Sequence, residues 1–292
     1  MNKLSLSNVF GKTLMATGIL GLAACSAVVA DTTTLSNKDK AVALVSSIET
    51  GDVAPIAYIN PERYIQHNLA VGDGLAGFGA VMHMLPEGSA KAEVKRAFQD
   101  GDFVVLHTEY NFFGPKAGFD VFRFEEGKIV EHWDNLQEIA PANISGRTQF
   151  DGPTEVTDLD KTEENKAIVA NLVDTVFIKG DFSKIGQFIG PEDSDYLQHN
   201  IGVADGLSGL SIAVQALNDA GLPMIYTENH KILGQGNFVL AISEGTFMNK
   251  HVSFYDLFRL DNGMIVEHWD TIEEIPAKAD WKNANGKFGF NK

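Results

Sequence analysis

The residues best suited to chemistry in the first part of the chain are one aspartate and three histidines. Asp120, His107 and His132 fall within predicted strands, and His67 precedes a predicted helix. Alternation along a strand places Asp120 on one face with Phe122, so its carboxyl group lies among apolar side chains. Burial raises the pKa of a carboxyl group and a neighbouring imidazole lowers it again, so such a pair exchanges a proton easily. If the four side chains converge in a cavity, they form an acid–base site that removes a proton next to a carbonyl or activates a water.

A second set of the same residue types lies further along the chain. It consists of Asp256, His268 and His199, in the same relative positions as in the first set. The second set is incomplete, because Ile242 takes the place of His107. We therefore expect the first set to be the active one and the second to be degenerate or structural.

Each of these residues also has a structural interpretation. His67 and His199 lie beside helix starts, where a side chain often bonds backbone groups. The strand histidines stand next to acidic residues and could form ordinary ion pairs with them. The tryptophans that follow, Trp133 and Trp269, are expected to pack in a core or interface. Asp120 is the strongest functional candidate, because a carboxylate on a Phe-lined face is costly without a use.

Metal or cofactor binding has little support in the sequence. His67, His107, His132 and Asp120 could ligate zinc if they converge. However, no residues are spaced as in HExxH or CxxC motifs, and the sequence has no Gly-rich phosphate loop, GxSxG elbow or nucleotide fingerprint. We therefore expect neither a metal nor an organic cofactor.

An internal repeat relates the two sets of residues. Tyr64–Gly74 aligns with Tyr196–Gly206 at seven identical positions of eleven. Asp120–Ile139 aligns with Asp256–Ile275 at twelve identical positions of twenty. A repeat over such a long period indicates duplicated domains rather than a solenoid. The chain is thus predicted to hold two copies of one domain in tandem.

The elements that must position these residues follow the same order in both copies. Apolar residues at helical spacing predict a first helix in each copy, and a second helix is expected after each Asp-Gly pair. Alternating patterns then predict strands over residues 103–110, 119–124, 128–133, 238–244, 252–260 and 264–269. Helices followed by a strand meander indicate an α+β fold.

The predicted domain boundaries follow from these elements. We expect a signal segment over 1–25, one domain over 26–145, a linker over 146–158, and a second domain over 159–278. The remaining tail, 279–292, is rich in Asn, Lys and Gly and is expected to pack loosely.

Two motifs together resemble a known family. The segment Tyr64–Asn68 (YIQHN), followed by Asp73-Gly74, and the segment Asp120–Asp134 (DVFRFEEGKIVEHWD) resemble the SnoaL-like branch of the NTF2-like superfamily. The resemblance extends over nearly all of both copies. It implies tandem cone-shaped folds, in each of which a bent antiparallel sheet wraps around N-terminal helices and encloses a pocket.

The same resemblance implies possible activities. Members include polyketide cyclases that perform an aldol-type ring closure, ketosteroid-isomerase-like enzymes, epoxide hydrolases and modules that only bind. In the cyclases an aspartate at the position of Asp120 and Asp256 acts as acid and base, and His107 resembles a strand histidine that accompanies it. Single-domain members often pair through the open sheet face. The copies are therefore expected to form an intramolecular pseudo-dimer, with Trp133 and Trp269 at its interface.

The N-terminus resembles an export signal. Lys3 and Lys12 precede an apolar run too short to span a bilayer permanently. The run ends in Leu-Ala-Ala-Cys25, which resembles a bacterial lipobox in which the cysteine is lipidated. Cleavage after Ala30 by an ordinary signal peptidase is the alternative. Both imply a location outside the cytoplasm, and the lipobox implies a periplasmic protein held to a membrane only through its lipid anchor.

Charge and composition narrow the partners. The formal net charge of −16 disfavours nucleic acid, whose phosphates it would repel. Nineteen phenylalanines favour a small apolar ligand. We expect an exported SnoaL-like enzyme that performs general acid–base chemistry on a small apolar carbonyl compound. The alternative is a periplasmic module that binds a small ligand, or acts as a scaffold, without catalysis.

Overall fold

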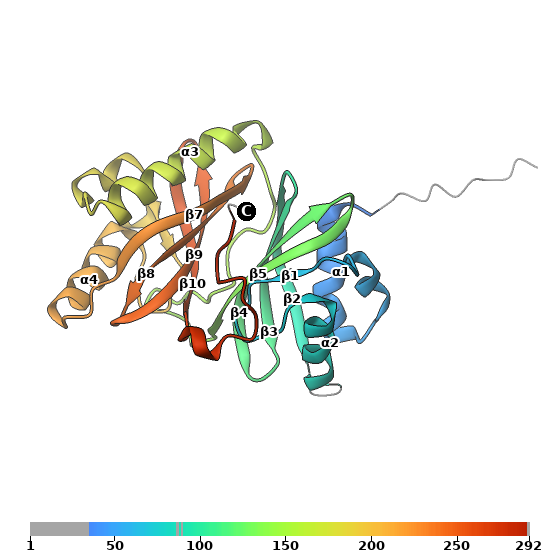
Figure 1. Ribbon diagram of the computed structural model, residues 1–292. Coiled ribbons are helices and arrows are strands. Elements are labelled where there is room, and N and C mark those ends of the chain that lie inside the picture. Colours follow the sequence, from blue (N-terminus) through green and yellow to red (C-terminus); the bar gives the residue numbers. More distant parts are fainter. Residues whose placement is uncertain (1–34, 86–87, 89, 291–292) are drawn as a thin grey trace, which may run out of the picture. The chain divides into compact units, whose positions relative to one another are not determined.

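The computed structural model describes residues 35–85, 88 and 90–290. The predicted export signal and its Cys25 lie outside these residues. Within them the fold is α+β, as predicted, and is built on two five-stranded sheets (Figure 1). No helix among the described residues has both the length and the apolar character needed to cross a membrane.

Capping residues set the ends of the first helix. Helix α1 (Asn37–Thr50) begins after Ser36, whose hydroxyl oxygen accepts a hydrogen bond from the Asp39 backbone N–H at 3.1 Å. It ends at Gly51, which adopts a left-handed φ of 69° that costs a glycine little. The first helix predicted for this half is therefore confirmed.

The first sheet is formed in the first half of the described chain. Its strands run in the order β1-β5-β4-β3-β2, with β1 parallel to β5 and the other pairs antiparallel. The bounds of this half are α1, β1 (Ile65–Gln66), α2 (Gly74–Met84), β2 (Lys91–Asp100), β3 (Phe103–Asn111), β4 (Pro115–Glu125) and β5 (Lys128–Glu138).

The second sheet has the corresponding order β6-β10-β9-β8-β7, again with one parallel pair, β6 with β10. Helix α3 continues into a π-helical segment, Val173–Ile178. The bounds of this half are α3 (Thr162–Leu172), β6 (Leu197–Gln198), α4 (Gly206–Asp219), β7 (Ile225–Gln235), β8 (Phe238–Phe247), β9 (Lys250–Asp261) and β10 (Met264–Glu274).

Tight turns hold the strands that carry the candidate residues. The β4–β5 hairpin turns at Glu126-Gly127, with φ of 48° and 73°, and the β9–β10 hairpin at Asn262-Gly263, with φ of 49° and 77°. Positive φ at both central residues is the geometry that matches the twist of paired strands. The first of these turns fixes the register between β4 and β5, so that Asp120 lies across from the strand that carries His132.

Strands β2 and β7 were not among the predicted strands. Polar residues interrupt their alternation, because both strands lie at the edge of a sheet and are partly exposed. The other six long strands agree with the predicted ranges to within a few residues.

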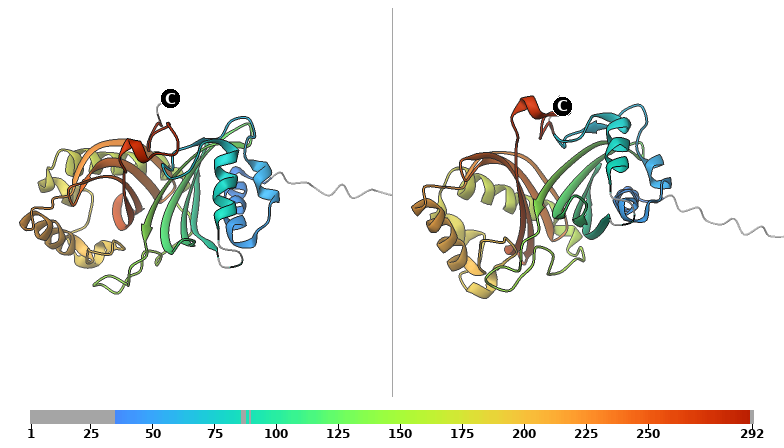
Figure 2. Two further views of the ribbon diagram at one scale, coloured as in Figure 1. Left: turned by 60° about the horizontal axis from the view of Figure 1, so that its bottom comes forward. Right: turned by 90° about the horizontal axis from the view of Figure 1, so that it is seen from below.

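In each half the helices cover one face of the sheet. Figure 2 shows α1 and α2 on one side of the strands β2–β5. There Leu44 and Val45 of α1 share a buried apolar cluster with Val104 and Phe122 of the sheet. The opposite faces of the two sheets contribute to one common buried cluster, which includes Trp133 and Trp269.

The segment after each sheet crosses to the other half. Residues 143–152, here called the linker strap, bind the second half: the Asn143 side-chain amide donates to the backbone oxygens of Gln198 at 2.6 Å and Val203 at 3.0 Å. Residues 282–290, the tail strap, bind the first half: the Asn283 amide donates to the Asn68 backbone oxygen at 2.7 Å.

The prediction that the tail packs loosely was therefore wrong. Lys287 of the tail strap is only 5% exposed. Asn and Lys were interpreted as signs of a solvated segment, but here the asparagine amides donate to backbone carbonyls of the first half.

Candidate functional site

An apolar cavity of about 240 Å³ lies between the helices and the sheet of the first half. Its polar residues gather on the sheet, and its walls come mainly from α1, α2 and the end of β3. The polar lining consists of Tyr64, Gln66, Asn68, Tyr110, Asp120, His132 and Asp134, and the apolar lining includes Leu44, Val45, Ile48, Phe78, Phe112, Phe122 and Leu136.

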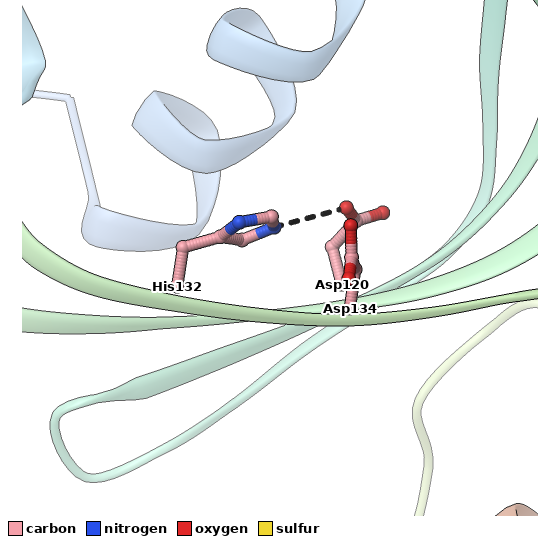
Figure 3. A group of neighbouring side chains, drawn as sticks. All are labelled: Asp120, His132 and Asp134. Atoms are coloured by element: carbon pink, nitrogen blue, oxygen red, sulfur yellow. Dashed lines mark hydrogen bonds and ion pairs between the residues drawn. The ribbon is translucent and has the colours of Figure 1, made fainter. Parts of the chain in front are cut away.

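Strand register brings the aspartates and the histidine together. Asp120 on β4 pairs directly with Asp134 on β5, and His132 precedes Asp134 by two residues on the same face. His132 Nε2 lies 3.2 Å from Asp120 Oδ1 (Figure 3). All three side chains are buried, and one potential ligand atom from each lies within 4.8 Å of the others. The structure thus brings together Asp120 and His132, as expected.

Gln66 determines which ring nitrogen of His132 carries hydrogen. The Gln66 side-chain oxygen accepts from the Asn68 backbone N–H at 2.9 Å, which fixes that atom as an acceptor. His132 Nδ1 lies 3.1 Å from the same oxygen and must therefore donate to it. The contact between His132 Nε2 and Asp120 is then favourable only when a proton lies between them. The geometry thus creates a buried pair that shares a proton.

Each aspartate has a further donor. The Tyr110 hydroxyl donates to Asp120 Oδ2 at 2.6 Å, and the Asn68 side-chain amide donates to Asp134 Oδ2 at 2.7 Å. Burial and the Asp120 carboxylate raise the pKa of Tyr110 well above its usual range, so its hydroxyl keeps its proton. Asp120 therefore receives one bond on each oxygen.

The second half contains a cavity of about 290 Å³ with corresponding polar groups. His268 Nε2 lies 3.1 Å from Asp256 Oδ1, and His268 Nδ1 lies 2.9 Å from the Gln198 side-chain oxygen. That oxygen accepts from the Asn200 backbone N–H at 3.0 Å, which fixes the ring as in the first half. The Asn200 amide in turn donates to Asp270 Oδ2 at 2.6 Å.

Two groups of the second cavity, His268 and Asp270, have raised pKa values. Burial disfavours a charged ring at His268, but the hydrogen bond to Asp256 and the charges of Asp270 and Asp256 outweigh it and raise the pKa of His268. Burial, together with the charge of Asp256, raises the pKa of Asp270 to about 6, although His268 opposes the shift. Two carboxyl groups with different environments thus face one cavity.

His107 does not reach the cavity, and the prediction that it converges with Asp120 was wrong. Its register partner is Phe119, whereas Leu106 is the residue opposite Asp120, so His107 points to the other face of the sheet. There it stacks on Phe119 at 4.4 Å and contacts Arg96 Nη1 at 3.1 Å. Burial and the Arg96 charge lower the pKa of His107 well below its usual range.

The difference between His107 and Ile242 therefore has no bearing on either cavity. Ile242 pairs with Tyr255 and lies in the buried cluster between the sheets. The reason for expecting only the first half to be active is removed.

His67 and His199 also lie outside the cavities, so the expected convergence of His67 was wrong. His67 contacts Glu131 Oε1 at 2.9 Å and the Gly286 backbone oxygen at 2.7 Å. Both partners are acceptors, so both bonds form only when both ring nitrogens carry hydrogen. His199 likewise bridges Glu267 and Thr148. These histidines bind the straps to the sheets, each stacked on a tryptophan.

Among the described residues, the zinc set predicted from His67, His107, His132 and Asp120 is not assembled. The groups that could hold a cation in a cavity are instead Asp120 with His132 and Asp134, and their counterparts Asp256, His268 and Asp270. Two carboxylates and one imidazole suit a divalent metal, and the same groups suit a shared proton.

Sequence reasoning missed five polar residues of the first cavity, Tyr64, Gln66, Asn68, Tyr110 and Asp134, and the corresponding residues of the second. Gln66 and Asn68 flank the His67 that was chosen, and a period of two starting at Tyr64 would have selected them. Asp134 lies two residues after His132 and could have been found in the same way. Tyr110 and Tyr226 had no such signal.

Comparisons with known proteins find only weak similarity to solved structures. No protein-family model and no curated protein sequence matches it. Among solved structures, an NTF2-like protein of unknown function from Cytophaga hutchinsonii is 16% identical, with 36% of this chain and 94% of that chain covered and a TM-score of 0.32. A candidate polyketide cyclase from Streptomyces antibioticus is 19% identical, with 35% and 93% covered and a TM-score of 0.31. A candidate ketosteroid isomerase from Kribbella flavida is 13% identical, with 40% and 83% covered and a TM-score of 0.32. Identities and TM-scores this low say nothing about function.

Proposed function

We propose that this protein is an enzyme that performs general acid–base chemistry on a small, apolar carbonyl compound, and that both cavities are active. The observation that carries the proposal is the buried Asp–His contact at hydrogen-bond distance, at the polar side of an apolar cavity. A second carboxyl group stands beside the pair in both halves. Such an arrangement supplies a base and an acid within reach of one ligand.

The second cavity illustrates the proposed steps. Asp256, paired with His268, accepts a proton from the carbon next to the carbonyl group. Asp270, whose pKa of about 6 keeps part of it protonated near neutral pH, donates its proton to the carbonyl oxygen. The product is an enol, which can return its proton at another position or attack a second carbonyl to close a ring. Asp120, His132 and Asp134 would act in the same way in the first cavity.

The charges of the cavities restrict the substrate. Asp120 and Asp134 would repel an anionic ligand in a low-dielectric space. The apolar walls favour a ligand of hydrocarbon character. We therefore expect a neutral aldehyde, ketone or ester rather than a carboxylate or phosphate.

We also propose that the halves are copies of one NTF2-like cone domain that pair within the chain, with boundaries at 26–145 and 159–278. Support comes from the same strand order in both sheets, the apolar cluster they share and the two straps. Export and lipidation at Cys25 remain part of this proposal and rest on the sequence of residues 1–25. Globomycin sensitivity and membrane fractionation of the expressed protein test them.

Deuterium exchange tests the proposed activity without knowledge of the product. Small ketones, aldehydes and esters are incubated with the protein in D2O, and loss of the proton signal next to the carbonyl is followed by NMR. We expect the double variant Asp120→Asn/Asp256→Asn to lose about 10²–10⁴-fold of the enzymatic rate. Glu126→Gln, which changes an exposed turn carboxylate, is the control and should retain it.

Two results would contradict the proposed enzymatic activity. One is equal exchange by the double variant and the wild type. The other is a compound that binds, as judged by a raised melting temperature, but is recovered without any exchange. That second result would favour a binding module.

A further inference from the structure

Asp120 and Asp256 each lie within hydrogen-bond distance of the hydroxyl of a buried tyrosine, but the two tyrosines come from different strands. Tyr110 lies on β3 and donates to Asp120 Oδ2 at 2.6 Å. Tyr226 lies on β7, the edge strand, and its hydroxyl is 3.2 Å from both oxygens of Asp256. The same contact is thus made from two different backbone positions.

Strand register shows that the ring and a small residue have changed places. Leu106 pairs with Asp120 and Ala241 pairs with Asp256, so Tyr110 and Gly245, four residues further along, occupy corresponding positions.

On the neighbouring strand, Ala92 pairs with Tyr110, and Tyr226 pairs with Gly245. Where the first half has alanine beside tyrosine, the second has tyrosine beside glycine.

A third position has changed together with these two. Gly118 lies two residues before Asp120, and Phe254 lies two residues before Asp256. A Cβ atom on Gly118 would come within 2.7 Å of the Leu136 side chain and 2.9 Å of the Tyr110 ring, so glycine leaves room for both. In the second half that space is free, and Phe254 stacks on the Tyr226 ring at 4.1 Å.

Packing alone does not account for the hydroxyl. A phenylalanine at either position would supply the same ring and fill nearly the same volume. In both halves, however, the ring that reaches the aspartate carries a hydroxyl, although the backbone position differs. The feature retained is therefore the hydrogen bond to the carboxylate.

We propose that Tyr110 and Tyr226 are positioning residues for the acid–base aspartates, a role that rests on the proposed function. Each hydroxyl stabilises the ionised carboxylate and holds it in the orientation in which Oδ1 faces the histidine ring. The proton of the pair then stays on the imidazole, and the aspartate remains available as a base. Burial and Asp256 keep Tyr226 protonated, because they raise its pKa well above the usual range.

The test is the position of the shared proton, read from the ring ¹⁵N signals of His132 and His268. Tyr226→Phe should move the His268 signals toward those of neutral imidazole, and Tyr110→Phe should do the same for His132. Tyr255→Phe is the matched control, because the buried Tyr255 hydroxyl has no hydrogen-bond partner among the described groups. It should leave both histidines unchanged.

Moving the tyrosine to the neighbouring strand tests whether the hydrogen bond to the aspartate matters or the backbone position of the tyrosine. The triple variant Ala92→Tyr/Tyr110→Gly/Gly118→Phe gives the first half the arrangement of the second. It should restore the His132 signals lost in Tyr110→Phe. Its partner Ala92→Phe/Tyr110→Gly/Gly118→Phe differs by one hydroxyl and should not. If the triple variants do not fold, the single Tyr→Phe variants decide.

The pH dependence gives a second readout for any compound that shows exchange. The acid limb of the rate profile should move to higher pH by about 1 unit in the Tyr→Phe variants, because the base loses a hydrogen-bond donor. Unchanged ¹⁵N signals in folded Tyr110→Phe and Tyr226→Phe would overturn the positioning role. Shifted signals without exchange of any carbonyl compound would support the role of the tyrosines and count against the carbonyl chemistry.

Discussion

The two cavities share an Asp–His–Asp group but differ in what lies beside the second aspartate. In the first half, Lys287 of the tail strap places its Nζ 4.0 Å from Asp134 Oδ1 and also contacts Glu273. In the second half, no lysine or arginine among the described residues lies within ion-pair distance of Asp270, and its pKa is raised to about 6. The comparison teaches that a strap outside the cavity can place a cation beside a carboxyl group within it.

Removal of Lys287 should have the largest effect on stability among the changes that test this difference between the halves. Lys287→Met leaves the buried Asp134 and the partly exposed Glu273 without their cation, so the free energy of unfolding should fall by about 3 kcal/mol in chemical denaturation. Arg147→Met is the matched control in the linker strap, since its ion pair with Asp205 is more exposed and should contribute about 1 kcal/mol or less. Equal losses in both variants would contradict a special role for Lys287.

Asp270, which has no lysine or arginine beside it in the described part of the chain, should make the free energy of unfolding depend on pH. Its folded pKa of about 6 lies above the ordinary value of 3.8, so folding favours the protonated form and stability is lost as the pH rises through this interval. The raised pKa of His268 acts in the same direction at higher pH, because its contribution is present below the ordinary value and lost above the folded one.

Asp270→Asn should remove the first of these losses. It should increase the free energy of unfolding at neutral pH by up to about 3 kcal/mol and change it little near pH 4. Chemical denaturation at both pH values measures this. Asp134→Asn is the control and should not stabilise, because Lys287 lies beside Asp134. The same gain at both pH values would mean that titration of Asp270 is not the cause.

The sequence predicted six of the eight long strands of the described chain and the Asp–His pairs, but not the faces of the short elements. Strand β1 has two residues, so the period of two that places Gln66, rather than His67, beside His132 is visible only when Tyr64 and Asn68 are counted with the strand. For His107 the error was a register of one residue, which moves a side chain to the opposite face of a sheet. Register between strands depends on turns and bulges, and local patterning did not specify it here.

The sequence also did not predict the contacts of the two straps. Asn143, Asn283 and Lys287 are polar residues in segments without periodicity. Their order comes from contacts with residues far away in the chain, such as the backbone oxygens of Gln198 and Asn68. Composition predicted loose segments because it contains no information on such partners.

The central claim is that both cavities act through their buried Asp–His pairs. Deuterium exchange by Asp120→Asn and Asp256→Asn, each made alone, tests it most directly, with His107→Leu as a variant of the opposite sheet face. We predict that each aspartate variant retains about half of the wild-type rate if the two sites are independent, and that His107→Leu retains all of it. Complete loss in Asp120→Asn and in His107→Leu, with full activity in Asp256→Asn, would contradict the account.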